Sequence, residues 1–393
     1  MIQGTIRQVH LVSNDYPTLA SIVLSLIPDD KTAQNENVES IIWRKRGYLS
    51  MDISDFFARS SLSKLRFLEL SGNFRISSWD HLTSRTTLLT TLSLEMFESS
   101  PSPIPNPTIS QLLSILISNP NLQKLRLTNE ALPKDTDVST LRVPLHHLKI
   151  LSLLGDFRRL FGLLRQLILP ETLDDMYLSG SNPTVEEVSQ ILWPYMLDHF
   201  RRDARFQDRL EVVSYSARSF ISITVGVICA LGTAPAPRVS LALALDGRPP
   251  DVLEQFFINL VLPTPRERIV SLVADLDTKL PEELVFMMLN IERLYLFNVG
   301  LSKRFLQPKP GGRHANAKLF PSLLSLRLEG VKLDDNDWGH LITYLIHQNA
   351  GGQTISLGMD GDLPYMPPEV VNEVEGLVKE FAYRPNPVGE RGK

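Results

Sequence analysis

The residues that most often carry catalysis are few in this sequence and widely spaced. The single cysteine, Cys229, lies in the apolar run 220–231, and no histidine follows it until His314. A thiol nucleophile needs a base close by, whereas free cysteines are among the most buried residue types. We therefore interpret Cys229 as a core residue and expect no catalytic chemistry at this position.

Two other groups contain residue types that bind metals, but the spacing of these residues does not suit a metal site. His146 and His147 are adjacent and precede a predicted strand, where neighbouring side chains point to opposite faces, and no third ligand is close in the sequence. The run that contains Asp334, Asp335 and Asp337 lacks the glycine and the glutamate of a calcium loop. These acids are better interpreted as the first residues of a helix, where the helix dipole favours them. We expect no metal site.

The sequence also lacks the motifs of common enzyme families. It contains no glycine-rich phosphate loop followed by Lys-Ser or Lys-Thr, no Gly-x-Gly-x-x-Gly, no Gly-x-Ser-x-Gly and no His-Glu-x-x-His. We therefore predict that the chain is not an enzyme and binds no cofactor.

Composition narrows the range of partners and compartments. Lys and Arg number 40 and Asp and Glu 44, which is too balanced to indicate nucleic-acid binding. One cysteine in 393 residues suits an intracellular protein, cytoplasmic or nuclear. Residues 1–8 do not have the form of a signal peptide, and the run 220–231 is shorter than the ~20 residues that span a bilayer. We expect no contact with a membrane.

The elements that position any functional residue are built from a repeated leucine pattern. The segment Leu65–Asn73 reads L-x-x-L-x-L-x-x-N, the strand segment of a leucine-rich repeat. Weaker copies of the strand core begin at Leu89, Leu122, Leu148, Leu173, Ile291 and Leu323. The first five starts are separated by 24, 33, 26 and 25 residues, by subtraction, close to the ~20–29 residues of such repeats. Further strands are predicted at 7–14, 38–44, 210–215, 239–245, 269–274 and 354–357.

Helical patterns alternate with these strands. Apolar residues at helical spacing predict helices at 18–27, 108–117, 157–167, 184–196, 250–260, 281–289, 337–347 and 369–381. Thr184 and Glu187 form the capping-box pattern at the start of the helix predicted at 184–196. Asn119-Pro120 ends the helix predicted at 108–117. Strand, loop and helix in alternation predict an α/β leucine-rich-repeat solenoid with a curved parallel sheet on its concave face and helices on its convex face. We assign residues 1–382 to the solenoid, with an irregular middle at 197–263 and a possible break near 234, and 383–393 to a disordered tail.

Residues between the strand leucines are the candidates for function. Side chains alternate along a strand, so these residues lie opposite the leucines, on the concave face. The candidate protein-binding residues are Phe67, Glu69, Lys124, Arg126, Tyr177, Arg293, Tyr295, Phe297, Arg327 and Glu329. We give first place to Arg293, Tyr295, Phe297 and Arg327, because arginine and aromatic residues are enriched at binding hot spots. The alternative is an ordinary solvated sheet face.

The C-terminal part of the chain resembles a known family. The segment 320–330, FPSLLSLRLEG, followed by DNDWG at 335–339, is similar to the last repeats of fungal, basidiomycete-type F-box/leucine-rich-repeat proteins. The similarity continues at 351–357, 374–381 and 383–387, and in weaker form it covers about residues 2–387. In such proteins an F-box recruits the Skp1 adaptor of a cullin-RING (SCF) ubiquitin ligase, and the repeats hold the substrate.

An F-box itself is not recognised ahead of the repeats, because residues 16–28 fit the helix of a first repeat better. The resemblance implies the substrate-recognition region of an F-box-like protein, with a Skp1-type adaptor as partner only if an F-box exists upstream. The alternative is a stand-alone repeat scaffold or regulator that binds a protein partner without a role in ubiquitin ligation.

Overall fold

The chain divides into two compact units, each of which is a sheet with helices packed against it. The computed structural model describes residues 7–13, 38–45, 51–60, 62–96, 107–134, 141–181, 183–207, 209–217, 220–227, 237–244, 268–276, 290–297, 320–330, 335–350, 352, 354–361 and 366–385. Unit 1 is Met1–Pro183 and unit 2 is Thr184–Lys393. The division therefore falls well before the break near residue 234 that the sequence suggested. The predicted helices at 18–27, 250–260 and 281–289, and Cys229, lie outside the described residues.

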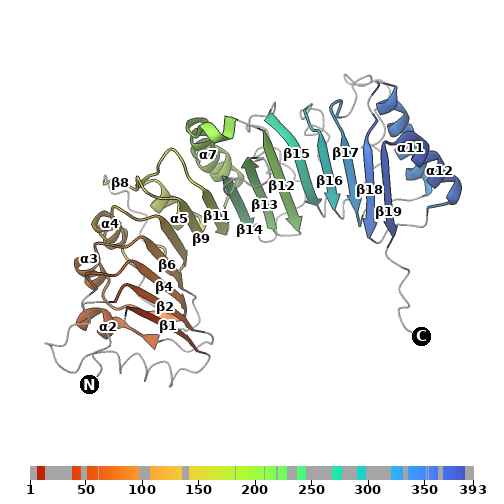
Figure 1. The fold of residues 1–393 in the computed structure, drawn as a ribbon. Helices are drawn as coiled ribbons and strands as arrows, with labels where there is room; N and C mark the ends of the chain where they lie inside the picture. Colours follow the sequence, from red (N-terminus) through yellow and green to blue (C-terminus); the bar gives the residue numbers. More distant parts are fainter. Residues whose placement is uncertain are drawn as a thin grey trace. The chain divides into compact units, whose positions relative to one another are not determined.

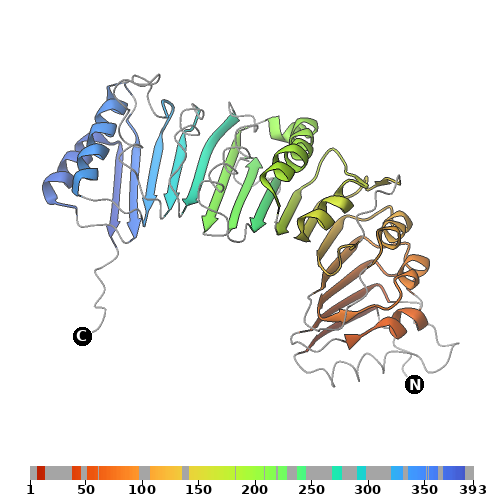
Figure 2. The same cartoon turned by 180° about the vertical axis from the view of Figure 1, so that it is seen from behind.

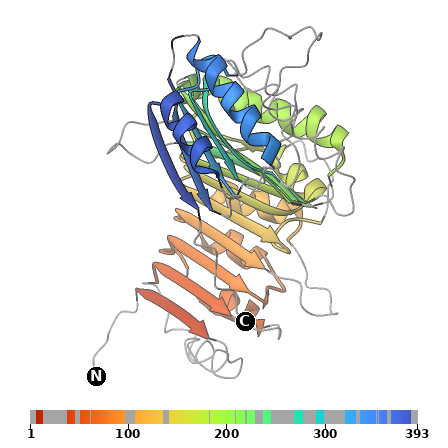
Figure 3. The same cartoon turned by 90° about the vertical axis from the view of Figure 1, so that its right-hand side faces the viewer.

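The main sheet of unit 1 is parallel throughout and follows the order of the chain (Figures 1 and 3). Its neighbouring strands are β1 (Gln8–Ser13), β2 (Ser40–Lys45), β4 (Phe67–Gly72), β6 (Thr91–Met96), β7 (Lys124–Asn129), β9 (Ile150–Asp156) and β11 (Asp175–Ser181). Two short parallel pairs flank it: β3 (Met51–Asp52) with β5 (Phe74–Arg75), and β8 (Val143–Pro144) with β10 (Leu167–Ile168).

Helices cover one face of this sheet. They are α2 (Ser54–Arg59), α3 (Asp80–Arg85), α4 (Ile109–Ser118) and α5 (Phe157–Leu164), and they lie on the same side of the strands (Figures 1 and 2). The helix predicted at 108–117 is confirmed, whereas the helix predicted at 157–167 ends at Leu164 and Leu167 lies in β10. Helix α4 ends as predicted: Asn119 is buried, its Oδ1 accepts from the Leu89 N–H at 2.8 Å, and its Nδ2 donates to the Ile115 carbonyl at 2.8 Å.

The strand leucines form layers under the helices. Leu68 faces Leu92 of the next strand and Leu70 faces Leu94, and all four are at most 1% exposed. The same alignment continues through the later strands to Met176 and Leu178. Burying one such side chain contributes about 1.5–3 kcal/mol. The leucine pattern of the sequence is therefore the core of unit 1.

A repeated hydrogen bond sets the alignment of these layers. Just before each strand, one carbonyl accepts the N–H groups of two successive residues at the start of the next strand. The carbonyl of Arg66, for example, accepts from Thr90 at 2.8 Å and from Thr91 at 3.0 Å. The carbonyls of Arg7, Glu39, Thr90, Gln123 and Lys149 do the same. Each strand thus begins at a position fixed by its predecessor.

The main sheet of unit 2 is mostly parallel but begins with antiparallel strands. From β12 (Leu210–Ala217) the strands β15 (Ile269–Leu276), β16 (Arg293–Phe297), β17 (Ser325–Glu329), β18 (Ser356–Gly361) and β19 (Glu380–Pro385) add in parallel. On the other side of β12, β13 (Phe220–Val227) and β14 (Arg238–Ala244) pair antiparallel.

The prediction of a wholly parallel sheet is therefore wrong for β12–β14. Strand β12 ends at Ala217 and β13 begins at Phe220, and so short a connection joins only antiparallel neighbours. The run 220–227 also has β-branched residues at every second position, namely Ile221, Ile223, Val225 and Val227, which suits a strand. The apolar content of this run alone does not predict a strand.

The helices of unit 2 differ from the prediction in their length. Thr184 and Glu187 form the predicted capping box, with the Thr184 N–H donating to Glu187 Oε2 at 2.9 Å and the Glu187 N–H to Thr184 Oγ1 at 3.1 Å. The helix continues through α6 (Val185–Glu187), a π-helical turn η1 (Val188–Leu192) and α7 (Trp193–Arg202), followed by the 3₁₀ turn η2 (Ala204–Gln207). Pro194 lacks the N–H that a regular turn needs, which accounts for the widened turn before it.

At the C-terminal end, α11 (Asp335–Asn349) and α12 (Pro368–Leu377) lie beside β18 and β19 (Figures 1 and 2). The predicted helix 337–347 is confirmed, but the helix predicted at 369–381 ends at Leu377 and Phe381 lies in β19. Residues 383–385, which we had assigned to a disordered tail, also belong to β19. Phe381 and Tyr383 alternate with Ala382 and Arg384, as side chains on opposite faces of a strand do. In this register Phe381 and Tyr383 extend the apolar layers of β18, which favours a strand here over a longer helix.

Helix α7 contains a buried histidine that the sequence analysis did not single out. His199 is 0% exposed, and neither ring nitrogen has a hydrogen-bond partner among the described residues. Burial lowers its pKa to about 4, an effect that the nearby Asp203 carboxylate partly offsets. The ring is therefore neutral at neutral pH and packs as an apolar group, edge-on to Phe206.

Gly72, at the end of β4, occupies a position that no other residue tolerates. Its φ is +129°, and a Cβ atom there would lie 2.3 Å from the Lys45 carbonyl oxygen of the neighbouring strand. A side chain would force the two strand ends apart, in addition to a backbone strain of about 1–3 kcal/mol.

We predict that Gly72→Ala lowers the free energy of unfolding by at least about 1–3 kcal/mol, measured by chemical denaturation. The matched control is Gly339→Ala in α11, where nothing lies within 4 Å of the added Cβ. Alanine is favoured over glycine in a helix interior by about 1 kcal/mol, so the control should be neutral or stabilised. Equal stability of Gly72→Ala and the parent protein would contradict the close contact with Lys45.

Candidate protein-binding face

The strands of unit 1 present one face that none of the helices in the described residues covers. Along each strand the buried leucines alternate with more exposed residues, as in β4 and β11. We call the surface formed by these residues the open face of unit 1. Strand register arranges it in three rows across the sheet. The first row is Gln8, Ser40, Phe67, Thr91, Lys124, Ile150 and Asp175; the second is His10, Ile42, Glu69, Ser93, Arg126, Ser152 and Tyr177; the third is Val12, Arg44, Ser71, Glu95, Thr128, Leu154 and Ser179.

From β4 onward, long and small side chains alternate along the second and third rows, and the alternation is offset by one strand. In the second row Glu69, Arg126 and Tyr177 are separated by serines, and in the third row Arg44, Glu95 and Leu154 are separated by Ser71 and Thr128. The small residues lie low between their neighbours: Ser93 is 1% exposed, Ser152 5% and Thr128 6%. A long side chain of one row can therefore extend diagonally to a long side chain of the other.

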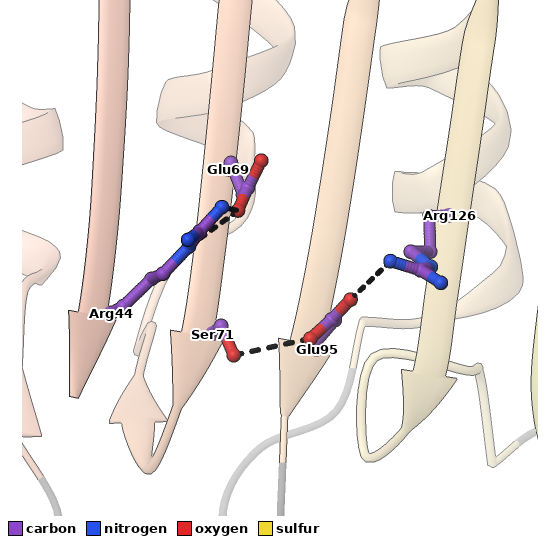
Figure 4. Close-up of polar contacts among 5 residues, drawn as sticks. All are labelled: Arg44, Glu69, Ser71, Glu95 and Arg126. Atoms are coloured by element: carbon purple, nitrogen blue, oxygen red, sulfur yellow. Dashed lines mark hydrogen bonds and ion pairs between the residues drawn. The ribbon is translucent and has the colours of Figure 1, made fainter. Parts of the chain in front are cut away.

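Two of these diagonals are ion pairs (Figure 4). Arg44 Nη2 lies 2.6 Å from Glu69 Oε1, and Arg126 Nη1 lies 2.8 Å from Glu95 Oε1. The Ser71 hydroxyl donates to Glu95 Oε2 at 3.1 Å, so the carboxylate of Glu95 is held from both neighbouring strands. Exposed pairs of this kind contribute about 0–1 kcal/mol, so their main effect here is to hold the side chains in place.

Unit 2 has an open face of the same kind on β15–β19. Its first row is Ser271, Arg293, Ser325, Ser356 and Glu380; its second is Val273, Tyr295, Arg327, Gly358 and Ala382; its third is Asp275, Phe297, Glu329, Asp360 and Arg384. Five of these residues contact one another: Tyr295, Phe297, Arg327, Glu329 and Asp360. We call them the Tyr295 cluster.

The Tyr295 cluster is an aromatic pair joined to an arginine between two carboxylates. The rings of Tyr295 and Phe297 are 4.0 Å apart between centroids, and the Arg327 guanidinium lies 4.7 Å above the Tyr295 ring. Arg327 Nη2 lies 3.0 Å from Asp360 Oδ2 and 3.7 Å from Glu329 Oε2. Its side chain lies beside Gly358, where an added Cβ would make only ordinary van der Waals contact, 3.5 Å from Arg327 Cγ. The guanidinium is therefore held in one orientation, although the side chain is 51% exposed.

The phenol of Tyr295 belongs to the same network. Its hydroxyl donates to Glu329 Oε2 at 2.6 Å. Burial, the hydrogen bond to Glu329 and the charge of that carboxylate raise the pKa of Tyr295 to about 12, while Arg327 acts in the opposite sense. The phenol stays protonated at neutral pH and remains a donor to Glu329.

The ten residues singled out in the sequence fall into two groups. Phe67, which is 46% exposed, and Glu69, Lys124, Arg126 and Tyr177 lie on the open face of unit 1. Tyr295, Phe297, Arg327 and Glu329 come together in unit 2, with Arg293 in the row before them on β16. The sequence interpretation missed Asp360, although the register that gives Phe297 and Glu329 continues to it. It also missed Arg44 and Glu95, which pair with predicted residues.

The described part of the chain contains no group of three or more histidine, cysteine, aspartate or glutamate residues placed to hold a metal ion. Nor does it contain a helix that is both long and apolar enough to cross a membrane. In comparisons with known proteins, no protein-family model matches the chain. A search of curated proteins also finds no match.

We predict that Glu329→Gln lowers the pKa of Tyr295 from about 12 towards the ordinary value of about 10. The substitution keeps a hydrogen-bond acceptor but removes the negative charge that opposes formation of the phenolate. Ring NMR of labelled tyrosine, assigned with Tyr295→Phe, follows the titration. Glu375→Gln on the exposed side of α12 is the control and should leave it unchanged. The same titration in Glu329→Gln as in the parent protein would contradict the assigned hydrogen bond.

Proposed function

We propose that the chain is a leucine-rich-repeat solenoid that binds a partner protein through its open faces, and that the Tyr295 cluster is the centre of binding. The observation that carries this proposal is the geometry of that cluster. Tyrosine and arginine are enriched among the residues that dominate binding energy at protein interfaces. Here an exposed arginine is stacked on a tyrosine and fixed by Glu329 and Asp360, so little side-chain freedom is lost when a partner binds.

The open face of unit 1 supports the same function by a different route. Its ion pairs Arg44–Glu69 and Glu95–Arg126 present charges of both signs in fixed positions, and the exposed ring of Phe67 lies in the first row of the same face. Mixed charges held in place favour recognition of one complementary surface and oppose others. A protein is the kind of partner that can cover so extended a polar surface.

The repeat character of the fold rests on the leucine pattern and on the way each strand starts. The first leucine of each motif, such as Leu65 or Leu89, is buried next to the two strand leucines that follow it. One carbonyl before each strand accepts two N–H groups from the next, in the same way along unit 1. Stacked units that each cover the apolar layer of their neighbour are the basis of a solenoid.

The resemblance of residues 320–387 to fungal F-box/leucine-rich-repeat proteins suggests where this binding is used. On that basis we propose that the chain is the substrate-recognition region of an F-box-like receptor of an SCF ubiquitin ligase. The second candidate is a stand-alone scaffold with the same binding faces and no ligase partner. The Tyr295 cluster supports protein binding equally in both, so a test of adaptor binding must separate them.

We expect the double substitution Tyr295→Ala with Arg327→Ala to remove capture of partner proteins by the immobilised chain. Binding-centre residues typically cost more than about 2 kcal/mol each when truncated, about 30-fold in affinity. The control is Ile346→Ala with His347→Ala, two exposed residues of α11 that lie outside the open face. Quantitative mass spectrometry of the captured proteins, with circular dichroism to check folding, measures the effect. Unchanged capture by the folded double variant would exclude the Tyr295 cluster as the centre of binding.

Adaptor binding separates the two candidate functions. If an F-box precedes the repeats, protein expressed from the full-length coding sequence should bind a purified Skp1-type adaptor, and the Tyr295→Ala, Arg327→Ala variant of it should bind the adaptor equally well because the adaptor is held outside the repeats. Isothermal titration calorimetry measures both affinities. Absence of heat with the folded full-length protein would favour the stand-alone scaffold.

A further inference from the structure

The start of each strand of unit 1 carries two residues that lie between buried leucines. Leu65 and Leu68 are both buried, whereas Arg66 and Phe67 between them are exposed. The carbonyl of the first residue of such a pair accepts the two N–H groups of the next pair, so the pairs line up along one edge of the sheet. In chain order they are Glu39-Ser40, Arg66-Phe67, Thr90-Thr91, Gln123-Lys124, Lys149-Ile150 and Asp174-Asp175.

Three cations follow one another along this edge with no acid between them. They are Arg66, Lys124 and Lys149, at the starts of β4, β7 and β9, and the pair at β6 between the first two is uncharged. Acids bound the group on both sides, at the starts of β2 and β11. We call Arg66, Lys124 and Lys149 the basic edge of unit 1.

The side chains of the basic edge have no hydrogen-bond or ion-pair partner among the described residues. Arg66 and Lys149 are exposed and Lys124 is half-buried. Elsewhere on the same face Arg44 and Arg126 are each paired with a glutamate, at 2.6 and 2.8 Å (Figure 4). The basic edge therefore carries a positive charge that the described part of the chain does not neutralise.

Apolar side chains lie at both ends of the basic edge. Phe67 follows Arg66 and is 46% exposed, and Ile150 follows Lys149 and is half-buried. Both belong to the first row of the open face. They are three strand spacings apart, about 14 Å, which an extended segment of four or five residues spans.

We propose that the basic edge binds an acidic segment of the partner protein, in which carboxylates lie between two apolar residues that contact Phe67 and Ile150. The inference rests on the proposed function only in taking a protein as the partner of the open face. Its basis is charge complementarity, because unpaired cations on the rim of an interface attract and orient a segment of opposite charge.

The acids at the two ends of the basic edge limit the length of that segment. Glu39 lies before Arg66, and Asp174 and Asp175 lie after Lys149. A negative charge that extended beyond the basic edge would meet these carboxylates, and like charges in contact oppose binding. A short acidic segment fits between them, whereas the phosphates of a nucleic acid continue in both directions.

Fluorescence anisotropy with the purified full chain tests the proposal. The probe is a labelled peptide Gly-Phe-Glu-Glu-Glu-Phe-Gly, and its counterpart has glutamine in place of each glutamate. Because exposed ion pairs are individually weak, we expect a dissociation constant of about 0.1–1 mM for the glutamate peptide. The glutamine peptide should bind at least about fivefold more weakly. Added salt should remove most of this difference, because it screens exposed charges.

A reversal of charge shows whether the lysines contact the peptide. Lys124→Glu with Lys149→Glu should weaken binding of the glutamate peptide by about tenfold or more and create binding of the matching lysine peptide. A loss of folding would not produce this gain. The control is Arg142→Gln with Lys379→Gln, which removes two exposed cations outside the basic edge and should leave both affinities unchanged.

Equal binding of the glutamate and glutamine peptides, no gain of the lysine peptide by the reversed variant, or tighter binding of a short single-stranded RNA would each overturn the proposal. The Tyr295→Ala, Arg327→Ala variant should bind the glutamate peptide as the parent protein does, because the Tyr295 cluster lies in unit 2. Failure of the peptide to bind, together with loss of partner capture by that double variant, would overturn this inference and leave the proposed function standing.

Discussion

One repeated hydrogen-bond arrangement determines where each strand of unit 1 lies. A carbonyl just before one strand, such as that of Arg66 or Gln123, accepts two successive N–H groups at the start of the next. This contact aligns the strands residue by residue, without the one-residue slip that would turn every side chain to the other face. The carbonyl of Glu292 in unit 2 accepts from Leu324 and Ser325 in the same way. The apolar layers and the open faces both depend on this alignment.

From that alignment the two faces of each sheet acquire different roles. The covered face stacks leucine on leucine, and the burial of these side chains stabilises the fold. The open face carries the residues that alternate with these leucines, several of them charged. Small residues at alternate positions in unit 1, such as Ser93 and Thr128, lie between long side chains that reach a neighbour diagonally. Arg44, Arg126 and Arg327 are all held in this way.

The strand cores and several helix ends could be predicted from the sequence, because they depend on local patterns. The spacing of Leu65, Leu68 and Leu70 gives the strand β4, and Thr184 with Glu187 gives a helix start. The features that were missed depend on contacts between distant segments. The antiparallel β13, the strand β19 and the approach of Asp360 to Arg327 follow from pairing partners that no local window contains. The burial of His199 is likewise set by tertiary packing.

The claim on which the account depends is that partners bind the open face, and site-specific photo-crosslinking tests it most directly. A photoreactive amino acid in place of Tyr295 would lie on the open face of unit 2, and one in place of Ile346 on the exposed side of α11. We predict a crosslinked partner at position 295 that disappears when Arg327→Ala is added, and none at position 346. Crosslinking to the same partner from position 346, or with equal yield in the presence of Arg327→Ala, would contradict the account.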